Sequence, residues 1–181
     1  MNTEQIVEML RNSHTLFIQQ LQQLNKADFC YAPEGKWSAA QQLDHIVRSV
    51  SPVNRALGLP KFGIQWKFGT ANRPSQTFEG LVEKYNRKLQ EGGKSSGRFI
   101  PPPIEAAQKE KLLTKLTNVV SKLCSKTEKY SEEGLDKYIL PHPLLGKLTL
   151  REMLYFTAYH VEHHRQLVQK GLEYQISNAE L

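Results

Sequence analysis

Two histidines lie four residues apart near the end of the chain, at positions 160 and 164. They fall in a stretch, Thr149–Lys170, that reads as one long amphipathic helix. At about 100° of rotation per residue, the side chains of His160 and His164 are only about 40° apart around the helix axis. Both lie near the middle of its apolar side. The other residues on that side are Phe156, Thr157, Leu167 and Val168. Two imidazoles at this spacing can bind one divalent cation, as they do in metal-binding helices.

A purely structural explanation for this pair stays open. Histidines in a core can be hydrogen-bonded residues that bind nothing, although each ring must then satisfy two nitrogens and the two rings compete for partners. This competition favours the metal-ligand interpretation of His160 and His164. The neighbouring His163 falls at the edge of the apolar side, beside Glu162, and is predicted to be partly solvated.

A catalytic metal is rarely held by two histidines, so a third ligand is expected from a facing helix. The histidines that could supply it are His14, His45 and His142. Helical periodicity does not choose among them. His45 projects about 120° from the centre of its own apolar stripe, so a position facing a neighbouring helix fits as well as a ligand position.

Few other side chains suggest chemistry. We expect no G-x-S-x-G nucleophile elbow, and neither Cys30 nor Cys124 has a histidine close in sequence. The two cysteines lack CxxC spacing, which excludes a disulfide framework and a cysteine metal site. Asp44 and Glu162 adjoin histidines in sequence but face away from them on a helix. No catalytic residue is therefore assigned beyond the metal site.

Length and composition indicate one domain over residues 1–181. The formal charge of +6 raises the question of a nucleic-acid partner. The lysines of residues 104–130, however, share a face opposite the leucines, as in a solvated bundle helix, and clustered arginines and interleaved aromatics are missing. We expect no nucleic-acid partner. Without a signal-like or membrane-length apolar run, we also expect a cytoplasmic protein with no membrane contact.

Hydrophobic periodicity predicts four long helices. They are Thr3–Asn25, Ser38–Leu57, Ile104–Tyr130 and Thr149–Gly171. Ser38 with Gln41 matches a capping box, the side-chain pair that starts a helix, and Thr149 with Glu152 matches a second one. No strand is predicted. The sequence therefore indicates an all-α four-helix bundle.

The segment Gly58–Pro103 is too long for a tight connection between two of these helices. It contains one shorter amphipathic helix, Phe78–Leu89, and is otherwise predicted to be loop. We expect this long crossover to fold over one end of the bundle as a lid. Its aromatic residues Phe62, Trp66 and Phe68 would be costly to expose, so either lid packing or a homodimer contact is expected to cover them.

The order of the motifs resembles a known family. The W-S pair at residues 37–38, followed by L-D-H-I at 43–46, is similar to the start of the second helix in the DinB-like superfamily of YfiT-type proteins. The run H-P-L-L-G at 142–146, followed by Y-H-V-E-H-H at 159–164, is similar to the "HP-x-x-G, then H-x-x-H-H" ending of that family. Each motif is weak alone, but their order and separation span nearly the whole chain.

The resemblance implies a bundle with up-down-down-up topology and a divalent metal, zinc or nickel, held by His45, His160 and His164. Members with known activities are metal-dependent transferases that add a low-molecular-weight thiol, such as bacillithiol or mycothiol, to electrophiles; others are described as metal-dependent hydrolases. The resemblance does not imply contact with DNA. The crossover, which would form the substrate wall, is not shared across the family.

Two hypotheses of function result. The first is an enzyme for a small electrophilic substrate, in which the bound cation favours the deprotonated form of a thiol for transfer or of water for hydrolysis. The alternative is a non-catalytic helical-bundle binding protein, monomeric or dimeric, with a structural or vestigial metal site. Replacing His160 would abolish turnover in the first and change only stability or binding in the second.

Overall fold

Four long helices form the body of the molecule. The structure, a computed structural model, describes residues 1–179. The long helices are α1 (Thr3–Gln23), α3 (Ala39–Ala56), α6 (Lys109–Thr127) and α8 (Leu150–Ala179). Their apolar faces meet in one continuous core, in which Leu10, Leu43 and Leu116 are fully buried. The predicted helical bundle is confirmed.

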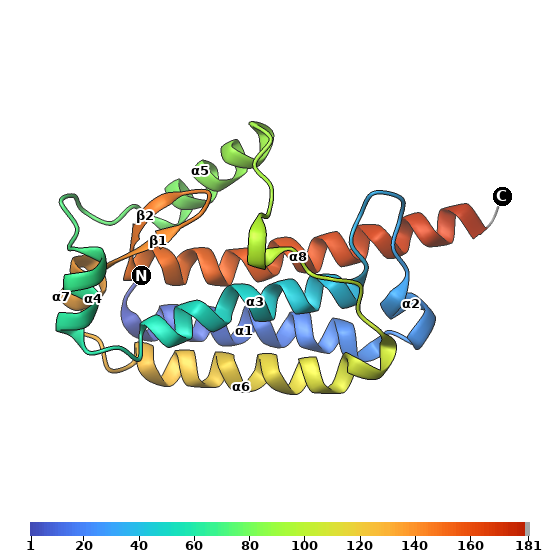
Figure 1. Cartoon of the computed structure of the whole chain (residues 1–181), viewed down its shortest axis with the longest axis horizontal. Helices are drawn as coiled ribbons and strands as arrows, with labels where there is room; N and C mark the ends of the chain where they lie inside the picture. Colours follow the sequence, from blue (N-terminus) through green and yellow to red (C-terminus); the bar gives the residue numbers. More distant parts are fainter. Residues whose placement is uncertain (180–181) are drawn as a thin grey trace.

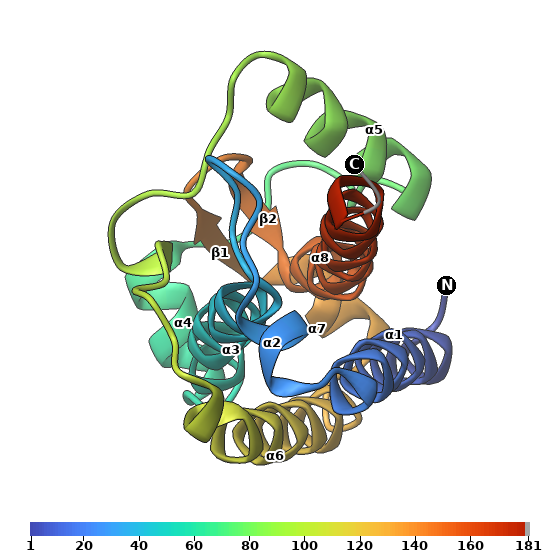
Figure 2. The ribbon, with the colours of Figure 1, turned by 90° about the vertical axis from the view of Figure 1, so that its right-hand side faces the viewer.

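The chain runs through the bundle in an up-down-down-up order. Helices α1 and α8 point in one direction, and α3 and α6 point in the other (Figure 1). Helix α1 packs against α6 and α8, and α3 packs against the same two helices, so α1 and α3 face each other across the core (Figure 2). Because α3 and α6 are parallel neighbours, the chain between them must return along the length of the bundle.

The predicted starts of two helices are confirmed by their caps. Ser38 Oγ accepts the N–H of Gln41 at 3.2 Å, and Gln41 Oε1 accepts the N–H of Ser38 at 3.1 Å. Thr149 Oγ1 accepts the N–H of Glu152 at 3.1 Å, and Glu152 Oε2 accepts the N–H of Thr149 at 2.8 Å. These capping boxes fix where α3 and α8 begin, and therefore where along each helix its histidines lie.

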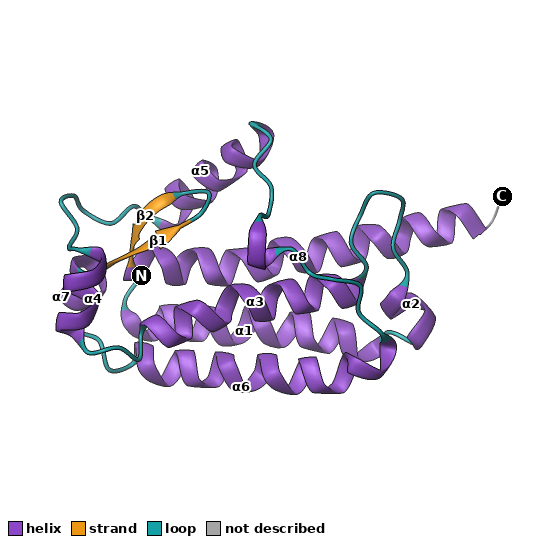
Figure 3. Cartoon of the chain, viewed as in Figure 1, coloured by secondary structure: helices purple, strands orange, loops and turns teal. Residues whose placement is uncertain are grey.

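The structure contains short elements that hydrophobic periodicity did not indicate (Figure 3). Three are helices: α2 (Lys26–Cys30), α4 (Lys61–Phe68) and α7 (Glu132–Lys137). The crossover also holds the predicted helix α5 (Phe78–Gln90) and the 3-10 turn η1 (Gly97–Phe99), and a second 3-10 turn, η2 (Ala106–Gln108), directly precedes α6. The prediction of loop for the rest of the crossover is therefore wrong at α4. Helices this short offer too few turns for an apolar period to be recognised.

A small antiparallel sheet contradicts the prediction that the chain has no strand. Strand β1 (Ile139–His142) pairs with β2 (Gly146–Thr149), with Ile139 opposite Thr149 and His142 opposite Gly146. Gly146 has a φ of 77°, a backbone conformation that favours glycine. Strands of four residues show too little alternation to be predicted. The hairpin lies at one end of the helices, so the all-α class holds.

Helix α8 extends past its predicted end at Gly171 and continues to Ala179. A glycine ends a helix when the chain turns there into the left-handed region, but Gly171 has no positive φ. Its bare backbone instead faces Pro33, whose Cγ would lie 3.7 Å from an added Cβ. Gln175 Nε2 then donates to Asp28 Oδ1 at 3.3 Å, which ties the extension to α2.

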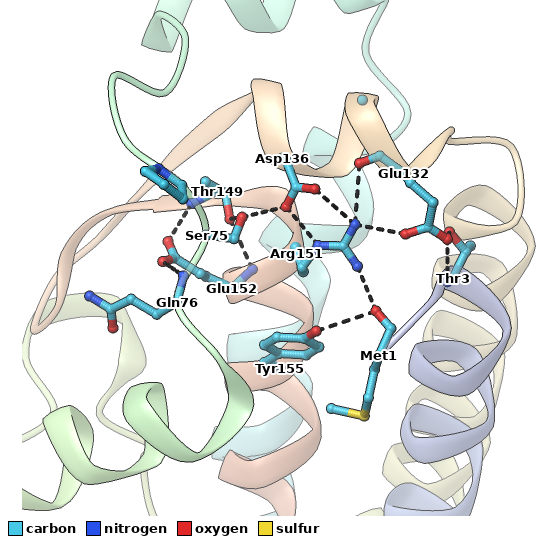
Figure 4. A network of polar contacts seen from close by, with 12 residues as sticks. Met1, Thr3, Ser75, Gln76, Glu132, Asp136, Thr149, Arg151, Glu152 and Tyr155 are labelled. Carbon is cyan, nitrogen blue, oxygen red and sulfur yellow. Dashed lines mark hydrogen bonds and ion pairs between the residues drawn. The ribbon is translucent and has the colours of Figure 1, made fainter.

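A polar network fixes the crossover to the start of α8 (Figure 4). The buried carboxylate of Glu152 accepts Arg73 at 2.6 and 2.9 Å and the N–H of Gln76 at 2.8 Å. Burial alone would raise the pKa of Glu152, but the hydrogen bonds from Arg73, Gln76 and Thr149 keep that pKa below its usual value. Beside it, Arg151 Nε donates to Asp136 at 2.6 Å and its Nη1 to the Met1 carbonyl at 2.7 Å.

Beyond this network, α5 packs along α8 through aromatic contacts. The ring of Phe78 meets Tyr155 edge-on at 5.8 Å, and Tyr85 meets Phe156 edge-on at 5.2 Å. On α4, however, Trp66 and Phe62 remain 88% and 78% exposed. Lid packing does not cover these two side chains, and a homodimer contact stays a prediction. Within residues 1–179, no helix combines the length and apolar character needed to cross a bilayer.

Candidate metal centre

Three buried histidines from two helices meet inside the bundle. His45 lies on α3, and His160 and His164 lie one turn apart on α8. The Nε2 atom of His160 lies 3.2 Å from Nε2 of His45 and 3.0 Å from Nε2 of His164. One ligand atom from each ring lies within 4.8 Å of the other two. The structure thus brings together the three residues that were expected to bind a metal; their role as ligands stays a prediction.

The outer nitrogens of two of these rings have hydrogen-bond partners that fix their proton. His45 Nδ1 donates to the carbonyl oxygen of Phe99 at 2.7 Å. His164 Nδ1 donates to the side-chain oxygen of Gln42. A neutral imidazole that carries its proton on Nδ1 presents a lone pair at Nε2. His45 and His164 therefore direct lone pairs toward the centre of the cluster, as metal-ligating histidines do.

Hydrogen bonds among the three rings would satisfy these nitrogens less well than a bound cation would. His160 can offer at most one N–H from Nε2, and that single donor would have to serve the lone pairs of both His45 and His164. A cation at the centre could accept all three lone pairs at once. The donor set therefore fits a divalent metal that accepts imidazole nitrogen.

Burial keeps the three rings neutral. Desolvation, followed by the neighbouring imidazoles, holds the pKa of His160 and of His164 well below the usual value. Burial also lowers the pKa of His45, although the Phe99 carbonyl opposes part of that shift. A metal binds unprotonated imidazole, so near neutral pH no proton has to be displaced from these rings.

A cavity of about 1100 Å³ borders the three histidines. Its walls are largely apolar, with Trp37, Val53, Tyr85, Met153 and Phe156 among the lining residues. The crossover supplies a further wall through residues 93–96 and 98–99. The part of the crossover that borders the cavity therefore lies over the side of the bundle, along α3 and α8, and for this part the prediction of a lid over one end is wrong in its position (Figure 2). Helix α4, by contrast, lies at one end of the long helices (Figure 1).

The sequence profile of the DinB superfamily matches residues 5–168, which is most of the chain and includes all three histidines. This chain belongs to the DinB superfamily. The resemblance inferred from its motifs is thereby confirmed at the level of the family.

Two solved structures share the fold of this DinB-superfamily chain. One is described as TT2238, a four-helix bundle protein, with 16% identity, a TM-score of 0.58, and coverage of 93% of this chain and 98% of that one. The other, a conserved protein from Enterococcus faecalis, has 17% identity, a TM-score of 0.62, and coverage of 94% and 95%. No curated protein matches the chain. At these identities the likeness shows the fold alone.

The other histidines of this DinB-superfamily chain lie outside the cluster. His14 is buried on α1, where its Nδ1 contacts the Leu10 carbonyl at 2.8 Å. His163 is half-buried and contacts the ring of Tyr85, which agrees with the predicted partly solvated position. His142 lies on β1 and lines the cavity. Of the three candidates for a third ligand, only His45 reaches the pair on α8.

The acids that adjoin the cluster in sequence do not act on it, and Ser49 Oγ, which lies 3.5 Å from His45 Nε2, donates to the His45 carbonyl at 2.9 Å. Asp44 pairs with Arg48, and Glu162 pairs with Arg165 at 2.6 Å. Residues 93–97 do spell G-x-S-x-G, so the expectation that this motif is missing is wrong. The segment lies between α5 and η1, however, with no strand before it, and Ser95 makes no hydrogen bond to a histidine in the described part of the chain. It is therefore no nucleophile elbow.

The sequence did not identify Gln42 and Phe99, the two acceptors that orient the cluster. Gln42 carries a weak signal: it is a polar residue one turn before His45, on a helix that buries most of that side. Phe99 carries none, because its contribution is a backbone carbonyl on a segment 54 residues from His45. Trp37 adds a ring stacked on His164, with centroids 6.4 Å apart, and its position was noted only as part of a motif.

Proposed function

We propose that this protein is a metal-dependent enzyme that acts on a small electrophilic substrate, either by transferring a low-molecular-weight thiol to it or by hydrolysing it. The observation that carries the proposal is the convergence of three neutral imidazoles at the wall of a large cavity. Neutral imidazoles with lone pairs directed at one point are a donor set for a divalent cation. The adjoining cavity gives a small molecule access to that point.

In this proposal His45, His160 and His164 hold Zn²⁺ or Ni²⁺. When bound, such a cation would favour the deprotonated form of a thiol or water molecule in the cavity and so supply a nucleophile near neutral pH. Gln42 and Phe99 keep the outer nitrogens of two histidines protonated and hold both rings in place. No side chain is assigned as a general base, because the acidic residues adjoining the histidines are paired with arginines.

The cavity walls would bind the body of the substrate. Tyr85, Met153 and Phe156 offer apolar contacts next to the histidines and limit the access of water to the reacting atoms. Burial raises the pKa of Tyr85 above its ordinary value, so its hydroxyl stays protonated at any physiological pH. Tyr85 is then a hydrogen-bond donor or acceptor in this wall and no proton-transfer base.

The test begins with metal content. Protein purified without an affinity tag should hold about one equivalent of zinc or nickel. His160→Ala and His164→Ala should lose the metal while the helical circular-dichroism signal stays. His163→Ala is the matched control, because His163 is the neighbour of His164 on α8 but lies outside the cluster. It should keep the metal.

Turnover is then measured with a panel of low-molecular-weight thiols and a chromogenic aryl halide, and with activated esters for hydrolysis. We expect activity in metal-loaded wild type and in His163→Ala, and none in His160→Ala or His164→Ala. A metal-free His164→Ala protein that retains turnover would reject the proposed chemistry. Metal binding without any turnover across both panels would instead favour the non-catalytic binding protein.

A further inference from the structure

His142 faces the same cavity, although it takes no part in the three-histidine cluster. It ends strand β1, and its ring meets the ring of Phe156 edge-on at 4.3 Å between centroids. Phe156 in turn stacks on His160 at 4.8 Å. One phenyl ring therefore separates His142 from the metal centre. A ligand of a few bonded atoms could touch both.

The hairpin turn fixes which nitrogen of His142 carries the proton. Its Nδ1 accepts the backbone N–H of Leu144 at 3.2 Å and that of Leu145 at 3.0 Å. A nitrogen approached by two N–H donors must present its lone pair, so the proton of the neutral ring lies on Nε2. Burial, and then the nearby Lys84, lowers the pKa of His142 to about 4, which agrees with a neutral ring at physiological pH.

The resulting Nε2–H donor has no partner within the part of the chain that the structure describes. No hydrogen bond joins Nε2 of His142 to any of residues 1–179, whereas the cavity borders the ring. A polar group half-buried among apolar walls gains most from a ligand atom that can accept its hydrogen bond. His142 thus presents a donor of fixed orientation beside the metal centre.

The charges around the cavity indicate what kind of acceptor fits. Apart from the histidines, the charged side chains that line it are Glu34, Lys36, Lys94, Arg98 and Lys170. Four of these five are cationic, so the potential inside favours an anion. The donor on His142 and the surrounding positive charge therefore both favour an anionic hydrogen-bond acceptor.

We infer that His142 is a ligand-binding residue whose Nε2–H donates to a carboxylate, or a similar oxyanion, on the molecule that occupies the cavity. The inference rests on the proposed function and deepens it: the substrate or thiol is an organic acid whose anionic group lies a few bonds from the atom that meets the metal. His142 acts here in binding, and no proton transfer is assigned to it.

The probes are mercaptoacetate and its longer homologues up to mercaptohexanoate, each compared with the mercaptoalcohol of the same chain length. Binding to the cobalt-loaded full chain is followed by the sulfur-to-cobalt charge-transfer band. In wild type, one chain length of the carboxylate should bind roughly tenfold or more tightly than its alcohol, as a hydrogen bond to a charged acceptor predicts. That preference should persist in high salt, which would screen an effect of the exposed lysines alone.

Two variants separate the Nε2–H donor of His142 from the acceptor that its Nδ1 provides to the hairpin turn. In His142→Asn the amide oxygen can still accept the N–H groups of the turn, as asparagine does in Asx turns. The shorter side chain has no donor at the position of Nε2. In His142→Gln the longer side chain returns an N–H near the position of Nε2. We expect the Asn variant to lose the carboxylate preference and the Gln variant to recover part of it. Cobalt stoichiometry and mercaptoalcohol affinity should be unchanged in both.

A carboxylate preference that survives in His142→Asn, or wild type that binds acid and alcohol equally, would overturn the role of His142 and leave the metal chemistry intact. Failure of every thiol to produce the charge-transfer band would instead reject the thiol-transfer form of the proposed function, and the inferred ligand class with it. An independent readout is the imidazole ¹⁵N spectrum of the metal-loaded protein. A proton on Nδ1 of His142 at neutral pH would also contradict the inference.

Discussion

Single hydrogen bonds decide which nitrogens carry protons in the three-histidine cluster. The outer nitrogens of His45 and His164 donate to Phe99 and Gln42, and each bond leaves a lone pair on the inner nitrogen. The two acceptors differ in kind, since one is a backbone carbonyl and the other a side-chain amide. Only the second can be tested by substitution.

Gln42→Leu should weaken zinc binding by roughly 10- to 100-fold, the usual effect of removing an outer partner of a metal ligand. Without that acceptor, His164 loses both its orientation and the preference for a proton on Nδ1. Affinity is measured by competition with a chromogenic chelator. Gln42→Glu, which keeps an acceptor at the same place, should bind zinc at least as tightly as wild type. Equal affinities for the Leu variant and wild type would show that Gln42 has no such role.

His14 should make the bundle sensitive to acid. Burial lowers the pKa of His14 from 6.5 to about 4 in the folded protein. The unfolded chain therefore binds a proton that the folded chain rejects, and stability falls as pH drops from 6.5 toward 4, by about 3 kcal/mol in total. Urea unfolding at several pH values measures this loss.

The matched variant for that measurement is His14→Leu, which cannot titrate. It also removes Nε2, a buried nitrogen without a hydrogen-bond partner among the described residues. We expect its stability to depend less on pH across this window than that of wild type. Parallel curves for the two proteins would place the acid sensitivity elsewhere.

Among the elements, the crossover is the one that completes the site, and it is fastened at two places. At its start, Arg73 and Gln76 bind Glu152 on α8. Near its end, Phe99 and Arg98 accept hydrogen bonds from His45 and Arg48 on α3 through their carbonyls. The wall of the cavity is therefore tied to both helices that supply histidines.

Glu152→Gln should loosen the first of these attachments. The carboxylate accepts four N–H groups, from Arg73, Gln76 and Thr149. The amide of Gln has only one oxygen to accept them, and its NH₂ group would point donors at the remaining N–H groups. We expect a loss of about 2 kcal/mol or more in the free energy of unfolding, with faster hydrogen exchange in α5. Glu83→Gln on the exposed side of α5 is the control and should change neither quantity. Unaltered exchange in α5 would mean that the network does not hold the crossover.

The elements that could be predicted are those whose local sequence decides them. Long apolar stripes and the capping boxes at Ser38 and Thr149 locate the bundle helices. The β-hairpin, α4 and the continuation through Gly171 depend on tertiary contacts, such as the one between Gly171 and Pro33. The same division holds at the site. His160 and His164 could be predicted because they share one helix face. The choice of His45 over His14 and His142 required the family resemblance. The role of the Phe99 carbonyl could be found only from the folded structure.

At the scale of the molecule, the bundle and the proposed metal centre have separate sources of stability. The core is a single apolar cluster drawn from all four long helices, and the three histidines are a small part of the buried surface. The fold should therefore survive loss of the metal, unlike that of small zinc domains.

Removal of zinc by a chelator should leave the helical signal unchanged at room temperature. Free zinc at about 100 times its Kd should raise Tm by roughly 5 to 10 °C, because the metal binds the folded state alone. His163→Ala should show the same rise, and His160→Ala should show little of it. Unfolding of the wild-type protein on chelation would mean that the metal site is structural.

The central claim is that His45, His160 and His164 coordinate one metal ion, and anomalous diffraction from zinc-loaded crystals tests it most directly. We predict a single strong anomalous peak about 2.0–2.1 Å from Nε2 of all three residues, next to the cavity. A peak that contacts only the α8 pair, with His45 beyond bonding range, would contradict the account. So would three well-ordered rings with no peak between them at saturating zinc.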